Sequence, residues 1–172
     1  MNDAWCLDEE EHDILNLSLK QRTLAHVKTF WEKSHDEEIE RLFPFNRVSL
    51  HDEVERFQAS LLPDAKSFGR VIYADEAYIG DVWCYNIDEA VEKSAFVSII
   101  IFEKRYWGMG IGKEALNLFF ALVFEKYAID KLCAFTYKAN VRSLGMLKDA
   151  GFHMVEEFEE DGVPSCYYER PR

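Results

Sequence analysis

Residues 96–113 read FVSIIIFEKRYWGMGIGK, and this stretch decides the fold. Its first part belongs to an apolar, β-branched run over residues 95–102, which predicts a strand covered on both faces and central in its sheet. A glycine-rich turn follows, and the apolar side chains after it have helical spacing. These side chains are Ala115, Leu116, Phe119, Phe120 and Val123. The stretch therefore predicts a strand, a turn and a helix in direct succession.

The turn has the composition of a phosphate-binding site. Gly108, Gly110 and Gly112 alternate, so the backbone can adopt positive φ and a bulky anion can approach the amide groups. Those amides stand at a helix N-terminus, which favours negative charge, and Lys113 adds a formal positive charge. The pattern predicts a pyrophosphate site. A turn that joins a strand to a helix without any ligand is the alternative.

Three other phosphate loops do not fit the spacing. A P-loop requires Ser or Thr after Gly-Lys, but Glu114 follows Lys113. A dinucleotide fingerprint reads G-x-G-x-x-G, whereas this turn reads G-x-G-x-G. A kinase glycine loop joins two strands, whereas this one opens a helix.

Two motifs resemble a known family. Residues 106–116, YWGMGIGKEAL, resemble the acyl-CoA-binding signature of the GNAT superfamily of N-acetyltransferases. Residues 140–152, NVRSLGMLKDAGF, are similar to the N-x-x-S-x-x-x-L-x-x-x-G-F helix of the branch that includes ribosomal-protein N-terminal acetyltransferases and spermidine acetyltransferases. The motifs occur in the family's order, and the resemblance covers roughly residues 78–152.

The resemblance implies the fold class α/β (α+β). It implies a GNAT-like mixed, mostly antiparallel, central sheet of about seven strands flanked by about four helices. We expect one domain over residues 1–172, with a mobile acidic lead at residues 1–12 and a charged connector at residues 35–40. Helices are predicted at about residues 21–33 and from Ser49 to Pro63. In the resembling family these two helices wall the acceptor-substrate side.

Composition restricts the partners. The net charge of -12 argues against nonspecific binding to nucleic acid or to an anionic membrane. Residues 103–148 form a positive island, with 8 Lys and Arg against 4 Asp and Glu, or +4, which leaves -16 for the other residues. The island coincides with both motifs, and an acidic remainder suits a cationic amine substrate. Four scattered Cys indicate free thiols and no metal site, and we expect a cytoplasmic protein, monomeric or homodimeric.

The resemblance also implies a cofactor, acetyl-CoA, and the residues that bind it. The pantetheine arm would pair with the central strand, where one N–H polarises the thioester carbonyl, and the pyrophosphate would bind the turn. Trp107 stands where the family often has Gln or Arg. The residues expected to bind acetyl-CoA are Ile100, Ile101, Phe102, Trp107, Gly108, Met109, Gly110, Ile111, Gly112, Lys113, Asn140 and Ser143.

The catalytic groups are less defined by the sequence. Many members of the family use a Tyr seven residues after the motif Asn, but here that residue is Leu147. In the resembling branch a Ser is the acid, which corresponds to Ser143, although Ser143 equally suits the first turn of a helix. Asn140 would bind the cofactor, cap the helix, or do both. Glu103, which follows the predicted central strand, and Tyr137, which ends the neighbouring one, are candidates for the base, and Glu157 and Glu159 of a predicted C-terminal hairpin are further choices.

The function implied is transfer of an acetyl group from acetyl-CoA to a primary amine. The acceptor would be a protein N-terminus, a polyamine or a small-molecule amine. Direct attack in a ternary complex is expected, since neither motif contains a Cys. The alternative is a non-catalytic GNAT-fold sensor or assembly module that binds acyl-CoA. A nucleotide-binding fold unrelated to CoA would leave the second motif unexplained.

Overall fold

The computed structural model describes residues 15–43 and 48–172, so the acidic lead expected at residues 1–12 lies outside the described residues. The elements follow in the order β1 (Leu17–Lys20), α1 (Leu24–Ser34), α2 (Glu37–Leu42), α3 (Leu50–Ser60), β2 (Phe68–Ala74), β3 (Ala77–Asp88), β4 (Ser94–Ile101), the 3-10 helix η1 (Lys104–Tyr106), α4 (Ile111–Lys126), β5 (Lys131–Tyr137), α5 (Val141–Asp149), β6 (His153–Glu160) and β7 (Val163–Pro171).

The strands form one sheet in the order β1-β2-β3-β4-β5-β7-β6. Every neighbouring pair is antiparallel except β4 and β5, which run parallel. β4 contains most of the apolar run at residues 95–102 and is the fourth of the seven strands. The predictions of a central strand and of a mixed, mostly antiparallel sheet are therefore confirmed.

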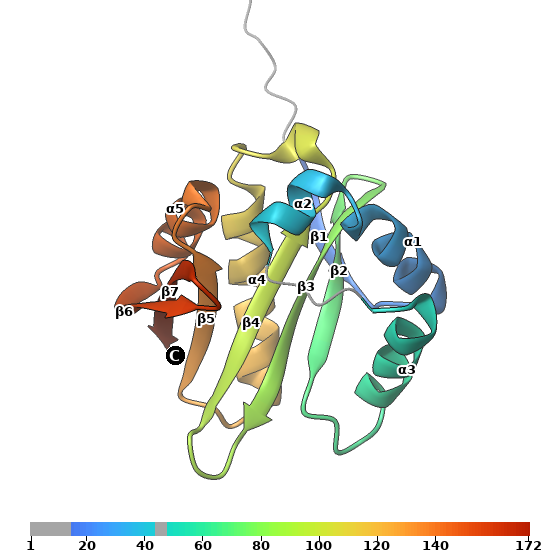
Figure 1. The fold of residues 1–172 in the computed structure, drawn as a ribbon. Helices are drawn as coiled ribbons and strands as arrows, with labels where there is room; N and C mark the ends of the chain where they lie inside the picture. The colour runs from blue at the N-terminus through green and yellow to red at the C-terminus, as the bar shows by residue number, and fades with distance from the viewer. Residues whose placement is uncertain (1–14, 44–47) are drawn as a thin grey trace, which may run out of the picture.

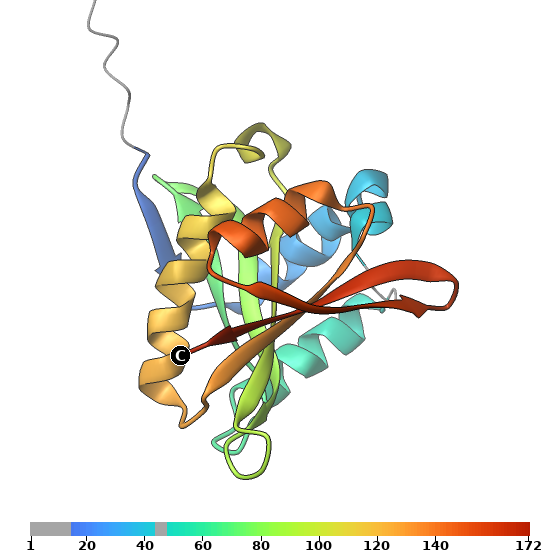
Figure 2. The same ribbon diagram turned by 90° about the vertical axis from the view of Figure 1, so that its left-hand side faces the viewer.

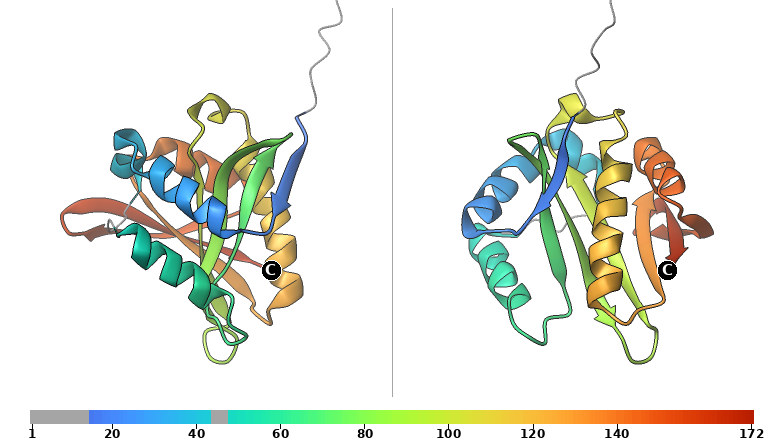
Figure 3. Two further views of the ribbon diagram at one scale, coloured as in Figure 1. Left: turned by 90° about the vertical axis from the view of Figure 1, so that its right-hand side faces the viewer. Right: turned by 180° about the vertical axis from the view of Figure 1, so that it is seen from behind.

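Helices cover both faces of the sheet. Figure 1 looks onto the face that carries α1, α2 and α3, and the view from behind in Figure 3 shows α4 and α5 on the other face. Side chains of β4 alternate between these layers. Val97 and Ile99 belong to the core beneath α4, whereas Ile100 packs with Phe30 of α1 and Ile39 of α2. The continuous apolar run of β4 is explained by this burial on both faces.

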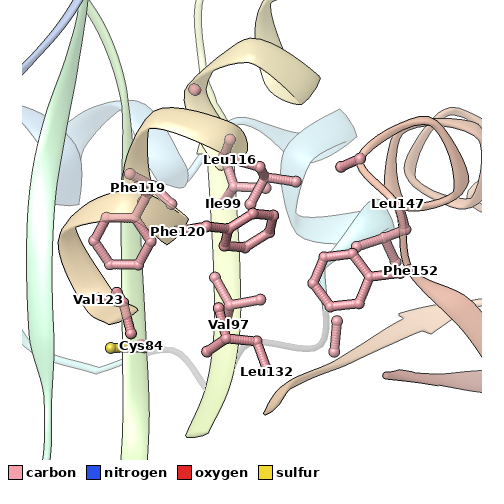
Figure 4. Packing of buried hydrophobic residues seen from close by; sticks show 14 of the residues in the cluster. Cys84, Val97, Ile99, Leu116, Phe119, Phe120, Val123, Leu132, Leu147 and Phe152 are labelled. Atoms are coloured by element: carbon pink, nitrogen blue, oxygen red, sulfur yellow. The ribbon is translucent and has the colours of Figure 1, made fainter. Parts of the chain in front are cut away.

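The larger core lies between α4 and the sheet. Figure 4 shows Phe120 of α4 beside Val97 and Ile99, Phe119 on the side of Cys84, and Phe152 on the opposite side of the same cluster. Phe119 has no solvent exposure. Burying an aromatic side chain of this kind contributes about 1.5–3 kcal/mol, so this layer fixes α4, and with it the glycine turn, on the sheet.

The charged connector predicted at residues 35–40 is wrong, because α2 begins at Glu37. The Asp36 side chain accepts hydrogen bonds from the backbone N–H groups of Glu38 (3.0 Å) and Ile39 (3.3 Å), and Lys104 lies 2.7 Å from the same carboxylate. A six-residue helix is not stable by itself, so these tertiary contacts stabilise it. The described residues thus form five α-helices rather than four, and none of the five is long and apolar enough to cross a bilayer.

The sheet ends in a hairpin of β6 and β7, which Figure 2 shows reaching out from the body of the protein. Asp161 and Gly162 connect the strands with φ of 50° and 80°, as a type I′ turn requires. The turn has two residues, because β6 ends at Glu160 and β7 begins at Val163.

Candidate active site

β4 and β5 pair only where they begin. Their parallel register joins Ser94 to Lys131, Ala95 to Leu132 and Phe96 to Cys133, and in the described structure it extends no further. Figure 1 shows the two strands moving apart toward their C-terminal ends. The side of β4 that faces β5 therefore has no strand partner between residues 97 and 101, and we call it the open edge.

The N–H and C=O groups of successive residues in a strand point alternately to its two sides. In β4, therefore, every second residue directs its backbone groups to the open edge. The Ile100 carbonyl points to β3, where a Cβ built on Gly80 would stand 2.1 Å from the oxygen. The Ile101 carbonyl accepts a 2.7 Å hydrogen bond from Trp107 Nε1, on the open side. The Phe102 N–H donates a 3.0 Å hydrogen bond to the Ile79 carbonyl of β3. Of the three residues expected to meet the thioester, Ile101 alone directs its backbone to the open edge.

The glycine turn leads directly into the N-terminus of α4. Gly108 and Gly110 both have φ of 79°, and a Cβ at either position would meet no other atom within 4 Å. Gly110 is the N-cap of α4, and no side chain caps the helix. The first N–H groups of a helix have no partner within it. They are therefore left to bind an anion, with Lys113 on the same turn.

Gly112 has a different role from the one predicted. It lies within α4 and does not have positive φ, so the expectation that all three glycines supply this conformation is wrong for Gly112. A Cβ at this position would stand 2.4 Å from Sδ of Met146 in α5. The missing side chain lets α4 and α5 approach each other beside the open edge.

A cavity of ≈ 350 Å³, the small cavity, lies between the open edge, the glycine turn, α2 and the start of α5. The two sequence motifs meet here. The predicted cofactor residues that line it are Ile100, Ile101, Trp107, Gly108, Gly110, Ile111, Gly112, Lys113, Asn140 and Ser143. Phe102 and Met109 do not line the small cavity, and Ile111 has its side chain in the core and offers only backbone.

Asn140 connects two parts of the small cavity, the start of α5 and the end of α2. Its Oδ1 accepts a 3.2 Å hydrogen bond from the Ser143 N–H and so caps α5. Its Nδ2 donates a 3.3 Å hydrogen bond to the carbonyl of Leu42, the last residue of α2. Ser143 also lines the cavity. The cap uses only its backbone N–H, so its hydroxyl has no part in the cap. Leu147, where many relatives have Tyr, is 3% exposed and belongs to the core (Figure 4).

α2 is held on both sides of the open edge. Glu38 forms ion pairs with Lys104 of η1 (3.1 Å) and with Arg142 of α5 (3.8 Å). The Arg142 guanidinium also lies 4.9 Å from the centre of the Trp107 ring. Helix α2 thus spans the small cavity from the end of β4 to the start of α5.

A second cavity of ≈ 1420 Å³, the large cavity, lies on the face of the sheet that carries α1 and α3. Phe43 lines both cavities, so the two meet there. Aromatic side chains are frequent in its lining: Phe30, Trp31, Phe57, Phe68, Trp83, Tyr85, Phe135 and Tyr137. Burial, helped by Glu160 and Asp161, raises the pKa of Tyr137, so its hydroxyl remains a hydrogen-bond donor.

Glu103, another sequence-based candidate for the base, lines neither cavity. Its carboxylate pairs with Lys33 Nζ of α1 at 3.0 Å. The structure instead places Asp81 of β3 in the lining of the large cavity, with an exposure of 3%. Sequence reasoning missed Asp81. The available signal was an aspartate inside the apolar run AYIGDVWCY, since charged side chains are seldom buried without a partner.

Splayed strands beside an uncapped helix N-terminus, with a cavity on each side, define an acyl-CoA-dependent acyltransferase domain. The chain belongs to the GNAT family, because the family model described as acetyltransferase (GNAT) domain matches residues 16–153. The N-acetyltransferase 9-like protein of Caenorhabditis briggsae is 31% identical over 142 residues, which cover 76% of this chain and 71% of that protein.

Solved structures share the fold. An aminoglycoside acetyltransferase, AAC(6')-Ib, solved with paromomycin and acetyl-CoA, gives a TM-score of 0.77 at 17% identity, over 91% of this chain and 94% of that one. Spermidine N-acetyltransferase from Vibrio cholerae, solved with CoA and spermine, gives a TM-score of 0.74 at 17% identity, over 91% and 95% of the two chains.

Proposed function

We propose that this protein transfers the acetyl group of acetyl-CoA to a primary amine by direct attack in a ternary complex. One observation carries the proposal: two cavities of different character meet at Phe43, beside the open edge of β4. The small cavity has unpaired helix amides and a lysine, which suit phosphates. The large cavity is lined by aromatic side chains and by five acidic side chains against four Arg and Lys, which suits an amine.

The residues of the small cavity fit acetyl-CoA. The N–H groups at the start of α4, with Lys113, bind the pyrophosphate. The Ile101 N–H, at the open edge, donates to the thioester carbonyl and stabilises the oxyanion as it develops. The cofactor supplies an acetyl group activated as a thioester. Ser143 lines the same cavity and gives a proton to the departing thiolate.

The cysteines that the structure describes support direct attack. Cys84, Cys133 and Cys166, the cysteines in the described ranges, are all buried. Burial raises the pKa of the Cys84 thiol to about 12, so it is not a thiolate at neutral pH. None of the three is suited to carry an acetyl group between the two substrates.

The acceptor we propose is the primary amine of a protein N-terminus, a polyamine or a small molecule. The N-x-x-S pattern at Asn140 and Ser143 supports a place in the branch of ribosomal-protein N-terminal and spermidine acetyltransferases. The names of the relatives agree with an amine acceptor, since they are acetyltransferases of aminoglycosides and spermidine. The size of the large cavity accommodates a peptide segment as well as a polyamine.

Thermal unfolding with and without acetyl-CoA tests the cofactor, and thiol release tests turnover. Ligand at about 100 times its Kd adds roughly 2.7 kcal/mol, or about 5–10 °C in Tm for a chain of this size. Amines to screen are spermidine, kanamycin and a peptide with a free N-terminal Met. A Tm rise without thiol release from any amine would favour the non-catalytic module, and no rise would refute the proposal.

A further inference from the structure

Asp81 is a buried carboxylate in the floor of the large cavity, with both oxygens engaged. Arg22 Nε lies 2.9 Å from Oδ2, and the Tyr78 hydroxyl donates a hydrogen bond to Oδ1. Arg22 also pairs with Glu53 of α3 at 3.3 Å. The carboxylate is therefore fixed in one orientation by two side chains, Arg22 from the loop between β1 and α1 and Tyr78 from its own strand, and Glu53 of α3 holds Arg22 in place.

The position of Asp81 relates the carboxylate to the reacting atoms. Its Cα is the cross-strand partner of Ile100 in β4, and cross-strand partners project their side chains to the same face of a sheet. Ile100 directly precedes Ile101, whose backbone faces the open edge. An amine that reached the thioester from the large cavity would therefore pass beside Asp81.

The charges around Asp81 favour a cation. Arg22 carries one positive charge and Asp81 with Glu53 two negative ones, so the ionised cluster has a net charge of -1. The titratable or charged groups that face it are Arg22, Glu53 and Tyr78, with His26 and Tyr73 packed against Tyr78. Burial raises the pKa of Asp81 to about 6, which makes it a stronger base than an exposed carboxylate, yet still ionised at neutral pH.

We infer that Asp81 accepts the proton of the acceptor amine, with Arg22 and Tyr78 as positioning residues. The inference rests on the proposed function. An alkylamine with a pKa near 10.4 is neutral in only about one molecule in 2500 at pH 7, so the site needs a proton acceptor. One ammonium proton passes to Asp81, and the nitrogen lone pair attacks the thioester carbon. The C–S bond breaks, Ser143 gives its proton to the thiolate and regains one from the nitrogen, and Asp81 returns its proton to solvent.

The test compares pH profiles of kcat/KM from pH 5 to 9, measured by thiol release with the best of spermidine, kanamycin and the Met-peptide. Asp81→Asn should lower kcat/KM by about 10²- to 10⁴-fold and remove the fall in rate below pH 6, with the acetyl-CoA affinity unchanged. Asp88→Asn is the matched control, because it is the same change on the same strand outside both cavities. It should keep the wild-type profile.

A second variant leaves the carboxylate in place. Tyr78→Phe removes a hydrogen bond that favours ionised Asp81, so the acidic limb should move to higher pH. A purely structural role would lower Tm without moving this limb.

Three results would overturn the inference. These are an unchanged profile in Asp81→Asn, an acidic limb that Tyr78→Phe does not move, or loss of that limb in Glu103→Gln instead. If the wild type released no thiol with any of the three amines, the proposed function would fall together with the inference.

Discussion

The indole N–H of Trp107 donates a 2.7 Å hydrogen bond back to the carbonyl of Ile101, the last residue of β4. The segment between them includes η1, and this hydrogen bond holds its far end against the end of β4. Together with the core layer beneath α4, this bond positions the glycine turn relative to the open edge. It also uses the Ile101 carbonyl, so the N–H of that residue is the group left for a ligand.

Trp107→Phe should weaken acetyl-CoA binding and lower stability by about 1 kcal/mol, because the Ile101 carbonyl loses its donor. Trp31→Phe is a matched control, since Trp31 Nε1 donates to the Val48 carbonyl at 2.9 Å, away from the small cavity. Both variants should lose a similar amount of Tm. Calorimetric titration with acetyl-CoA should distinguish them, and equal affinities would mean that the Trp107 bond does not shape the site.

Gly110→Val should abolish acetyl-CoA binding, because its side chain would enter the space that the glycine turn leaves open. Gly162→Val gives the matched strain, since Gly162 has φ of 80° and, like Gly110, no atom within 4 Å of a Cβ. Each change should cost about 1–2 kcal/mol in the free energy of unfolding. Retained affinity in Gly110→Val would show that the phosphates bind elsewhere.

Gly112→Ala should destabilise the protein by about 1–3 kcal/mol, because the new Cβ would clash with Met146 Sδ. The clash is with one side chain, so Gly112→Ala combined with Met146→Ala should lose less stability than the sum of the single changes. Urea unfolding of the four proteins measures the coupling. Additive losses would contradict a direct contact between α4 and α5 at this point.

Ser143→Ala should slow turnover and leave acetyl-CoA affinity and Tm close to the wild-type values. The change preserves the Ser143 N–H, which donates the capping hydrogen bond to Asn140 Oδ1. Asn140→Ala, by contrast, should lose about 0.5–2 kcal/mol of stability with the cap of α5. If Ser143→Ala turns over at the wild-type rate, Ser143 is not the acid.

Asp81 should make the protein less stable as the pH rises from about 4 to 6. Burial raises its pKa from 3.8 to about 6, so the folded state binds more protons than the unfolded state in this window. The free energy of unfolding falls there by at most about 3 kcal/mol. Urea unfolding of Asp81→Asn should lack this contribution, and its stability relative to wild type should rise between pH 4 and 7. Parallel pH curves would exclude a raised pKa.

The parts of the site that depend on local backbone were readable in the sequence. Gly108 and Gly110 need a conformation that only glycine adopts easily, and Asn140 caps the helix that its own segment forms. Local patterns of this kind also predicted the central strand and the helix after the turn. Ser49 and Asp52 form the expected capping box of α3.

The parts that depend on distant contacts were not readable. Asp36 begins a helix that Lys104, far from it in the sequence, stabilises. Gly112 has the same local pattern as Gly108 and Gly110, but it is required by the close contact with Met146 in another helix. Asp81 has a raised pKa because of burial, and the folded chain also brings Arg22 beside its carboxylate. In each case the decisive partner lies on another element, and a local pattern does not contain it.

In the described structure three residue pairs join β4 to β5. They connect a part of the sheet with four strands, β1 to β4, to a part with three, β5 to β7. A pantetheine arm with amide groups along the open edge would act as an inserted strand and join the two parts. Amide hydrogen exchange near Ile101 would then report occupancy. Since a ligand of the folded state raises the free energy of unfolding, the fraction of molecules open to proteases would fall as the thioester concentration rises. The lifetime of the protein in a cell would thus follow the supply of its own substrate.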